Sequence, residues 1–230
     1  MKLVLLPGMD GTGNLFADFV KALPSEYEAE IARYPTDVFI SYSDLIPIIG
    51  SSTPRSEPFV LVAESFSTPL AIRYAATNPP NLKGLVLYAR FATSPVRGWR
   101  RFFGYLLLPI LFRFPLPRFV VALLLVGSTA PRELTTAVKS AVSSVQRKVL
   151  MDRFRAVLEC DARAELTKTT VPVLYVRAKD DRLVPKSCLG EIQRIKPLTF
   201  VAEIRGPHLI LQREPTKTAE VVARFVRQIH

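Results

Sequence analysis

Cysteine is scarce in this sequence. Cys160 and Cys188 are the only two among 230 residues, and their separation matches no short metal-ligand spacing. This scarcity excludes a disulfide-dense scaffold and a cysteine-based zinc site. We therefore expect two buried or free thiols in a reducing compartment, and we predict a cytoplasmic protein.

Long uninterrupted apolar runs are also lacking. The first run covers 3–6 and ends at Pro7, whereas the apolar region of a signal peptide has about 7–15 residues. A transmembrane helix needs about 20 predominantly apolar residues. The most apolar stretch, 99–126, is broken by prolines and arginines such as Arg113 and Pro115. We expect 3–6 to be a core strand and no segment to span a membrane.

Acidic residues are the minority of the charged set. The chain has 31 Lys and Arg against 20 Asp and Glu, which gives a net charge of +11. The basic residues are scattered and form no nucleic-acid-binding motif, so a nucleic-acid partner is excluded. Two interpretations stay open: a solvated basic surface, or attraction to anionic lipid head groups or phosphate-bearing acyl carriers. The 49% share of hydrophobic residues indicates a globular protein with a large core.

Short apolar segments alternate with helical ones along most of the chain. We predict helices over 14–23, 42–49 and 68–77, each lying between two such segments. This alternation indicates a parallel sheet that is covered by helices on both faces. The six predicted strands are 2–6, 28–34, 59–63, 82–88, 173–178 and 199–204.

The alternation stops between 95 and 160, where aromatic residues and leucines are dense. We predict an amphipathic helix over 131–150, with 151–158 continuing it or starting another. Three interpretations of the apolar side chains stay open. They pack on the core, they line an acyl pocket, or they form an arginine-flanked lid that rests on an anionic membrane surface.

Ser65 follows an apolar strand directly and is followed at once by a helix. A sharp strand-to-helix turn of this kind exposes a serine hydroxyl as a nucleophile. The crowded turn needs small residues two before and two after the serine, and here these are Ala63 and Ser67. Glycine is usual at both places, so the motif is a weakened copy.

Candidate partners for this serine lie far downstream. A serine hydroxyl needs an adjacent base, and the chain has only two histidines, His208 and His230. His230 is the last residue and is expected to fray, which leaves His208 as the candidate base. The base needs an acid to fix its tautomer, and Asp180 and Asp181 follow the strand predicted at 173–178.

In the order serine, acid, histidine, and in the Gly-rich loop that precedes them, the chain resembles the alpha/beta-hydrolase family. The motifs are Leu-Pro-Gly-Met-Asp-Gly-Thr-Gly at 6–13, the Ser65 turn, Ala-Lys-Asp-Asp-Arg-Leu-Val-Pro at 178–185, and Gly-Pro-His at 206–208. Among family members it looks most like small bacterial carboxylesterases and thioesterases. The resemblance implies a mostly parallel sheet of about six strands, with helices on both faces and a small helical cap at 95–160. The core is then formed by 1–94 and 161–230.

The resemblance also implies a role for each residue. The family's acid motif selects Asp181 over Asp180, which is expected to be a solvated turn residue. Ser65, Asp181 and His208 then form the catalytic set. Backbone N–H groups of Phe66, directly after the nucleophile, and of Met9 are expected to hold the oxyanion.

Two residues beside these positions are interpreted structurally. We expect Asp10 to cap the next helix or to order the Gly-rich loop. For Glu64, beside the nucleophile, we expect a structural hydrogen bond. The loop itself lacks the endings of known phosphate-binding motifs, which argues against nucleotide binding.

The sequence therefore predicts a serine hydrolase that cleaves carboxylic esters with short to medium acyl chains through an acyl-Ser65 intermediate. It would use neither a metal nor an organic cofactor, and its partner would be a small acyl ester. A thioesterase or an acyltransferase with the same residues stays open, as does a non-catalytic lipid- or small-ligand-binding protein on the same scaffold.

Overall fold

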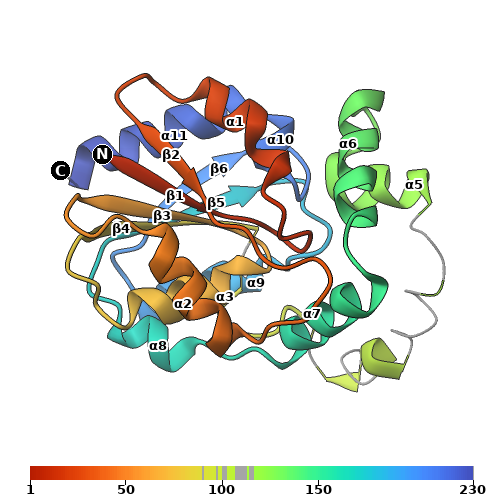
Figure 1. Cartoon of the computed structure of the whole chain (residues 1–230), viewed down its shortest axis with the longest axis horizontal. Coiled ribbons are helices and arrows are strands. Elements are labelled where there is room, and N and C mark those ends of the chain that lie inside the picture. Colours follow the sequence, from red (N-terminus) through yellow and green to blue (C-terminus); the bar gives the residue numbers. More distant parts are fainter. Residues whose placement is uncertain (90, 97, 100–102, 107–112, 114–116, 230) are drawn as a thin grey trace.

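The computed structural model describes residues 1–89, 91–96, 98–99, 103–106, 113 and 117–229. A six-stranded sheet has the order β2-β1-β3-β4-β5-β6, and every neighbouring pair of strands is parallel (Figure 1). All six strands were predicted from the sequence. They are β1 (Lys2–Leu6), β2 (Glu28–Ile31), β3 (Phe59–Glu64), β4 (Leu82–Tyr88), β5 (Val173–Ala178) and β6 (Phe200–Ile204).

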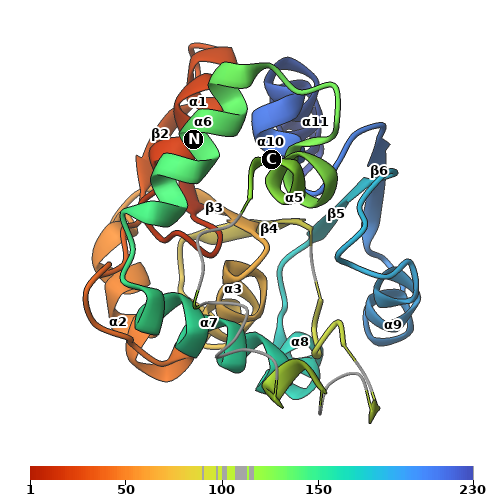
Figure 2. The same ribbon diagram turned by 90° about the vertical axis from the view of Figure 1, so that its right-hand side faces the viewer.

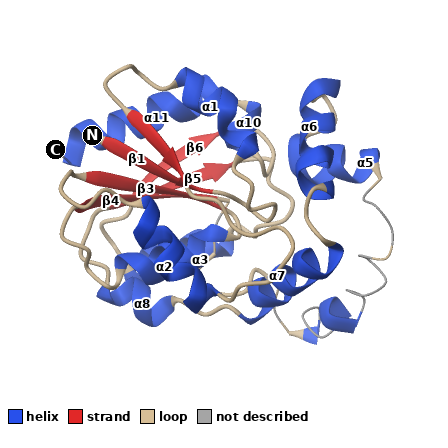
Figure 3. Ribbon diagram, viewed as in Figure 1, coloured by secondary structure: helices blue, strands red, loops and turns tan. Residues whose placement is uncertain are grey.

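Helices cover both faces of this sheet, as expected (Figure 3). On one face α1 and α11 pack against the side chains of Leu3, Leu5 and Val62. On the other, α2, α3, α8 and α9 pack against Val4 and Leu61. The alternating directions of strand side chains explain why both sets are apolar. The helices are α1 (Ala17–Ala22, after a 3₁₀ turn at Asn14–Phe16), α2 (Tyr42–Ser52), α3 (Ser67–Ala75), α8 (Arg163–Lys168), α9 (Ser187–Ile195), α10 (Ile210–Arg213) and α11 (Pro215–Ile229).

Strand β2 is shorter than predicted, because it ends at Ile31 and not at Tyr34. The backbone N–H of Tyr34 instead donates to the carbonyl of Gly11 at 2.8 Å. The chain thus leaves the sheet early and covers the Gly-rich loop.

The segment 95–160 holds the remaining helices at the carboxyl ends of the strands (Figures 1 and 2). They are α5 (Arg118–Val121), a π-helix (Ala122–Val126), α6 (Arg132–Ser143) and α7 (Arg147–Glu159). The chain leaves and re-enters the core at neighbouring points, where the N–H of Ser94 donates to the carbonyl of Cys160 at 3.1 Å. We propose that this insertion is the cap. Within the described parts of the chain, no helix is long and apolar enough to cross a membrane.

The predicted continuous helix over 131–150 is wrong, because the helix breaks between α6 and α7. At the break the N–H of Gln146 donates to the carbonyl of Thr36 at 2.8 Å, and Val145 is buried. A contact with the core, which helical periodicity does not reveal, therefore ends α6. His230, the second histidine, lies outside the described residues.

Candidate active site

Ser65 occupies a strained turn between β3 and α3. Its backbone φ is 48°, in the left-handed region that costs a non-glycine residue about 1–3 kcal/mol. Two backbone hydrogen bonds hold the turn: the N–H of Ser65 donates to the carbonyl of Tyr88 at 2.9 Å, and the N–H of Thr68 donates to the carbonyl of Ser65 at 3.0 Å. The strain is thus fixed by the sheet on one side and by the helix on the other.

The small residues around this turn are completely buried. Ala63 and Ser67 both have 0% exposure. The hydroxyl of Ser67 donates to the carbonyl of Pro7 and accepts a hydrogen bond from the hydroxyl of Tyr34, the two oxygens being 2.7 Å apart. The buried hydroxyl that serine adds in place of the usual glycine is therefore hydrogen-bonded, and it connects the turn to the Gly-rich loop.

His208 lies between Ser65 and Asp181. Its Nε2 is 3.0 Å from Oγ of Ser65, and its Nδ1 is 2.9 Å from Oδ2 of Asp181. The imidazole is buried, and the N–H of the next residue, Leu209, donates to the carbonyl of Leu125 in the insertion at 2.9 Å. The structure thus brings together the three side chains that the sequence singled out.

Asp181 uses its two oxygens differently. Oδ2 faces His208, and Oδ1 accepts the backbone N–H groups of Leu183 at 2.8 Å and Val184 at 3.1 Å. Burial by itself would raise the pKa of this carboxyl, but the hydrogen bond to His208, its charge and the two N–H groups together hold the pKa below its usual value. Asp181 therefore carries a negative charge against the imidazole. Asp180 is exposed, as expected for a turn residue.

The Gly-rich loop lies against the turn that carries Ser65. A Cβ atom added to Gly8 would be 4.0 Å from Cβ of Ser65 and 3.5 Å from Oε2 of Glu64. The loop is folded back on itself, since the N–H of Gly11 donates to the carbonyl of Gly8 at 3.1 Å. Met9, which follows Gly8, is thus held next to the turn that carries Phe66.

The comparisons with known proteins bear on this arrangement. No family model and no curated protein matches the sequence. Among solved structures, an esterase from Exiguobacterium antarcticum superposes with a TM-score of 0.85 at 16% identity, covering 99% of this chain and 92% of that one. A bromoperoxidase from Bacillus anthracis gives 0.83 at 16% identity, with 98% and 91% covered. A lipase-esterase related protein from Clostridium acetobutylicum gives 0.77 at 14% identity, with 97% and 93% covered.

The chain has the alpha/beta-hydrolase fold. The names of these neighbours cover different reactions, so the fold leaves the reaction open and the site must decide it.

Arg153 is a part of this hydrolase-fold site that sequence reasoning missed. It lies on α7 with 2% exposure. Its Nη1 donates to the carbonyls of Met9 at 2.8 Å and Asp10 at 2.9 Å, and its Nη2 donates to the carbonyl of Pro35 at 2.7 Å. Its guanidinium also faces the ring of Phe66, with 5.7 Å between its central carbon and the ring centroid. The insertion is thus hydrogen-bonded, through Arg153, to the loop that carries Met9.

Burial lowers the pKa of the Arg153 guanidinium, while the charges of Asp10 and Tyr34 act in the opposite direction. Arginine stays protonated under such shifts. A signal for this role existed in the sequence. Arg153 shares a helix face with the buried Val149, Leu150 and Val157, and a cation in an apolar stripe requires partners.

Asp10 orders the loop rather than capping a helix. Its Oδ2 accepts the N–H of Thr12 at 2.9 Å and the hydroxyl of the same residue. The helical turn that follows begins at Asn14, and its N-cap residue is Gly13. Of the two structural roles expected for Asp10, the structure has the second, ordering of the Gly-rich loop.

Glu64 has the structural hydrogen bond expected for it, because its Oε2 accepts the side-chain amide of Gln212 at 3.2 Å. Its Oε1 is buried and has no hydrogen-bond partner among the described residues. Burial raises the pKa of Glu64 to about 7, with the nearby charge of Asp10 acting in the same direction and His208 and Gln212 opposing. A carboxyl that titrates near neutrality thus lies beside Ser65.

Within the described parts of the chain, no group of three or more His, Cys, Asp or Glu side chains could hold a metal ion. The candidate site is therefore described by its own side chains and backbone.

Proposed function

We propose that this chain is a serine hydrolase that cleaves carboxylic esters with short to medium acyl chains through an acyl-Ser65 intermediate. One observation carries the proposal: the hydrogen-bonded series from Oγ of Ser65 through His208 to Asp181, with Ser65 on a strained turn. A binding site for a neutral ligand has no need of these three groups in this order.

The reaction begins when Nε2 of His208 takes the proton of Ser65 and Oγ attacks the ester carbonyl carbon. Asp181 stabilises the imidazolium that forms. The imidazolium then returns the proton to the leaving alcohol, and the acyl group stays on Ser65. Water attacks this acyl-enzyme in the same way, which releases the acid and restores the hydroxyl.

The tetrahedral intermediate places a negative charge on the former carbonyl oxygen. In this proposal the backbone N–H groups of Met9 and Phe66 stabilise that charge. Each such donor is worth about 2.7–4 kcal/mol of barrier. Arg153 supports the arrangement, because it binds the carbonyl of Met9 and leaves the N–H on the other side of the residue available.

An ester is the favoured substrate for two reasons. The insertion above the strand ends is rich in apolar residues, which suits an aliphatic or aromatic acyl group. Two of the structural neighbours named above also carry esterase names. A thioester fits the same chemistry, and an alcohol in place of water would give acyl transfer. The buried thiols of Cys160 and Cys188 support a reducing compartment and hence a cytoplasmic enzyme.

A non-catalytic ligand-binding protein is the alternative from another class. The substitutions at Ala63 and Ser67 favoured it at the level of sequence, because a distorted turn would displace the serine. In the structure Oγ of Ser65 lies within hydrogen-bond distance of His208 despite both substitutions, which supports the enzyme.

Hydrolysis of p-nitrophenyl esters from acetate to palmitate tests the proposal. We expect turnover by the parent protein, with an optimum at short or medium chains. Ser65→Ala should lose at least about a thousandfold in kcat/KM while keeping the parent's melting curve. Equal activity of the two proteins would refute the assignment of the nucleophile. A folded parent that cleaves only thioesters would move the proposal to a thioesterase.

A further inference from the structure

Several large apolar side chains of the insertion face solvent. Trp99 is 71% exposed, and Phe103 and Leu106, in the helical turn at 103–106, are 46% and 61% exposed. Phe119 on α5 and Leu123 on the π-helix that follows it are also exposed, at 70% and 46%. Large apolar side chains ordinarily pack inward. These five residues, which form two groups on the insertion, are called the apolar cap face.

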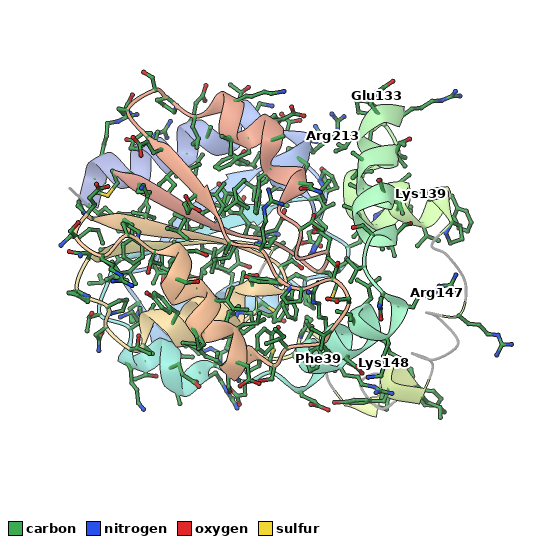
Figure 4. The ribbon with its side chains drawn as sticks, viewed as in Figure 1. Phe39, Glu133, Lys139, Arg147, Lys148 and Arg213 are labelled. Carbon is green, nitrogen blue, oxygen red and sulfur yellow. The ribbon has the colours of Figure 1, made fainter. Side chains whose placement is uncertain are left out.

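The positive charge of the chain is concentrated in the same segment. Between 95 and 160 there are eleven Lys and Arg against three Asp and Glu, so this segment holds +8 of the net +11. Arg113, Arg147 and Lys148 are exposed there. Figure 4 places Lys139, Arg147 and Lys148 on the side of the molecule where the insertion lies.

Two of these basic residues lie together on the insertion. Nη1 of Arg147, at the start of α7, donates to the backbone carbonyl of Arg113 at 2.9 Å. Two of the three acidic residues of the segment are engaged locally, since Asp152 binds Lys148 and Arg155 and Glu159 accepts the hydroxyl of Tyr105. The segment thus combines exposed apolar side chains with an excess of Lys and Arg over Asp and Glu.

We propose that the apolar cap face docks on an anionic lipid bilayer. Tryptophan and leucine side chains enter the interface between head groups and acyl chains, while flanking arginines and lysines bind lipid phosphates. Each Lys or Arg that lies near an anionic membrane surface raises the binding constant about fivefold. The uncompensated charge favours a lipid surface, because a protein partner would need a matching acidic face around its apolar contact.

Docking in this orientation faces the candidate active site toward the membrane. The insertion lies at the carboxyl ends of the strands (Figure 2), the end at which the Ser65 turn follows β3. Helix α7 spans both regions, with Arg147 at its exposed start and Arg153 on the Gly-rich loop. An acyl substrate dissolved in the bilayer would therefore meet the site from the membrane side.

Sedimentation with lipid vesicles tests the docking, and Ser65→Ala protein is used so that no turnover intervenes. The vesicles are phosphatidylcholine alone, or phosphatidylcholine with about a third phosphatidylserine. We expect binding to the anionic vesicles at 50 mM salt and weaker binding at 300 mM, since salt screens surface charge. In that background, Trp99→Ser with Phe119→Ser should weaken binding at least about tenfold. Arg147→Gln with Lys148→Gln should weaken it about fivefold or more.

Matched controls lie away from the insertion. Lys83→Gln with Arg224→Gln removes the same charge from exposed sites on the core, and Leu198→Ser removes a side chain that is 91% exposed. Both controls should bind like the Ser65→Ala protein, and circular dichroism should show every variant folded. Absence of binding to anionic vesicles at low salt would overturn the proposal, as would equal losses in cap and control variants. Ester turnover is measured separately, so an inactive parent that binds vesicles would contradict only the proposed function.

Discussion

At the scale of single residues, the two neighbouring aspartates after β5 differ sharply in their surroundings. Asp181 is hydrogen-bonded to His208 and to two backbone N–H groups, whereas Asp180 is exposed. Asp181→Asn should lower kcat by at least about a thousandfold, because the amide cannot stabilise the imidazolium. Asp180→Asn should change kcat by about twofold or less. Steady-state kinetics on one ester decide the ranking, and the opposite order would mean that the acid is Asp180.

Arg153 is expected to position the loop that carries Met9. Arg153→Lys keeps the charge but cannot reach all three carbonyls with the same geometry. We expect kcat to fall about 10–100-fold with KM nearly unchanged, since a displaced N–H donor weakens only the transition state. Arg155→Lys on the same helix is the control, because Arg155 contacts Asp152 and is partly exposed. A lower melting temperature with unchanged kcat would show that Arg153 is only structural.

Glu64 links stability to pH. Its pKa is raised from 4.5 to about 7 in the folded protein, so between these values the folded state binds the proton more tightly than the unfolded state. The contribution of Glu64 to the free energy of unfolding therefore falls as pH rises from about 5 to 8, by at most about 3 kcal/mol. Glu64→Gln removes this dependence.

Urea denaturation of the parent and of Glu64→Gln at pH 5 and pH 8 measures the effect. We subtract the free energy of unfolding of the parent from that of the variant at each pH. This difference should be larger at pH 8 than at pH 5. An identical difference between the two proteins at both pH values would contradict the raised pKa.

At the scale of elements, the turn between β3 and α3 has a strained backbone at Ser65, whose φ is 48°. Ser65→Gly should relieve the left-handed conformation, whereas Ser65→Ala keeps it. The glycine variant should therefore be more stable than the alanine variant by about 1 kcal/mol, although both lack the hydroxyl. Chemical denaturation compares the two, and an alanine variant of equal or greater stability would argue against a strained turn.

How far the sequence predicts an element depends on where its determinants lie. The six strands were predictable because their apolar runs are local signals, and the helices on both faces followed from the alternation. The break at 144–146 was missed because a contact between Gln146 and Thr36 creates it. The early end of β2 has a similar cause, since Tyr34 bonds to the Gly-rich loop.

The same distinction applies to the site. Ser65, Asp181 and His208 could be chosen from motifs that place them directly after strands. For Arg153 the apolar helix face predicts a buried cation, but its partners could not be predicted, because they are carbonyls contributed by distant loops. The contact between Ser67 and Pro7, which explains the departure from glycine, is also visible only in three dimensions.

At the scale of the whole molecule, the parallel sheet assembles the site from three distant parts of the chain. Strands β3, β5 and β6 all end at one edge of the sheet, and the segments after them carry Ser65, Asp181 and His208 (Figure 3). The insertion closes over this edge and supplies Arg153. It also carries most of the positive charge, so the candidate site lies beneath a basic, partly apolar exterior.

The most direct test of the central claim is labelling with a fluorophosphonate ester, followed by mass spectrometry of the intact protein and of its peptides. Such a reagent reacts with a serine whose proton is taken by a neighbouring histidine. We predict one adduct per chain, on Ser65, which is absent in Ser65→Ala and strongly slowed in His208→Gln. A folded protein without an adduct, or with the adduct on another residue, would contradict the account.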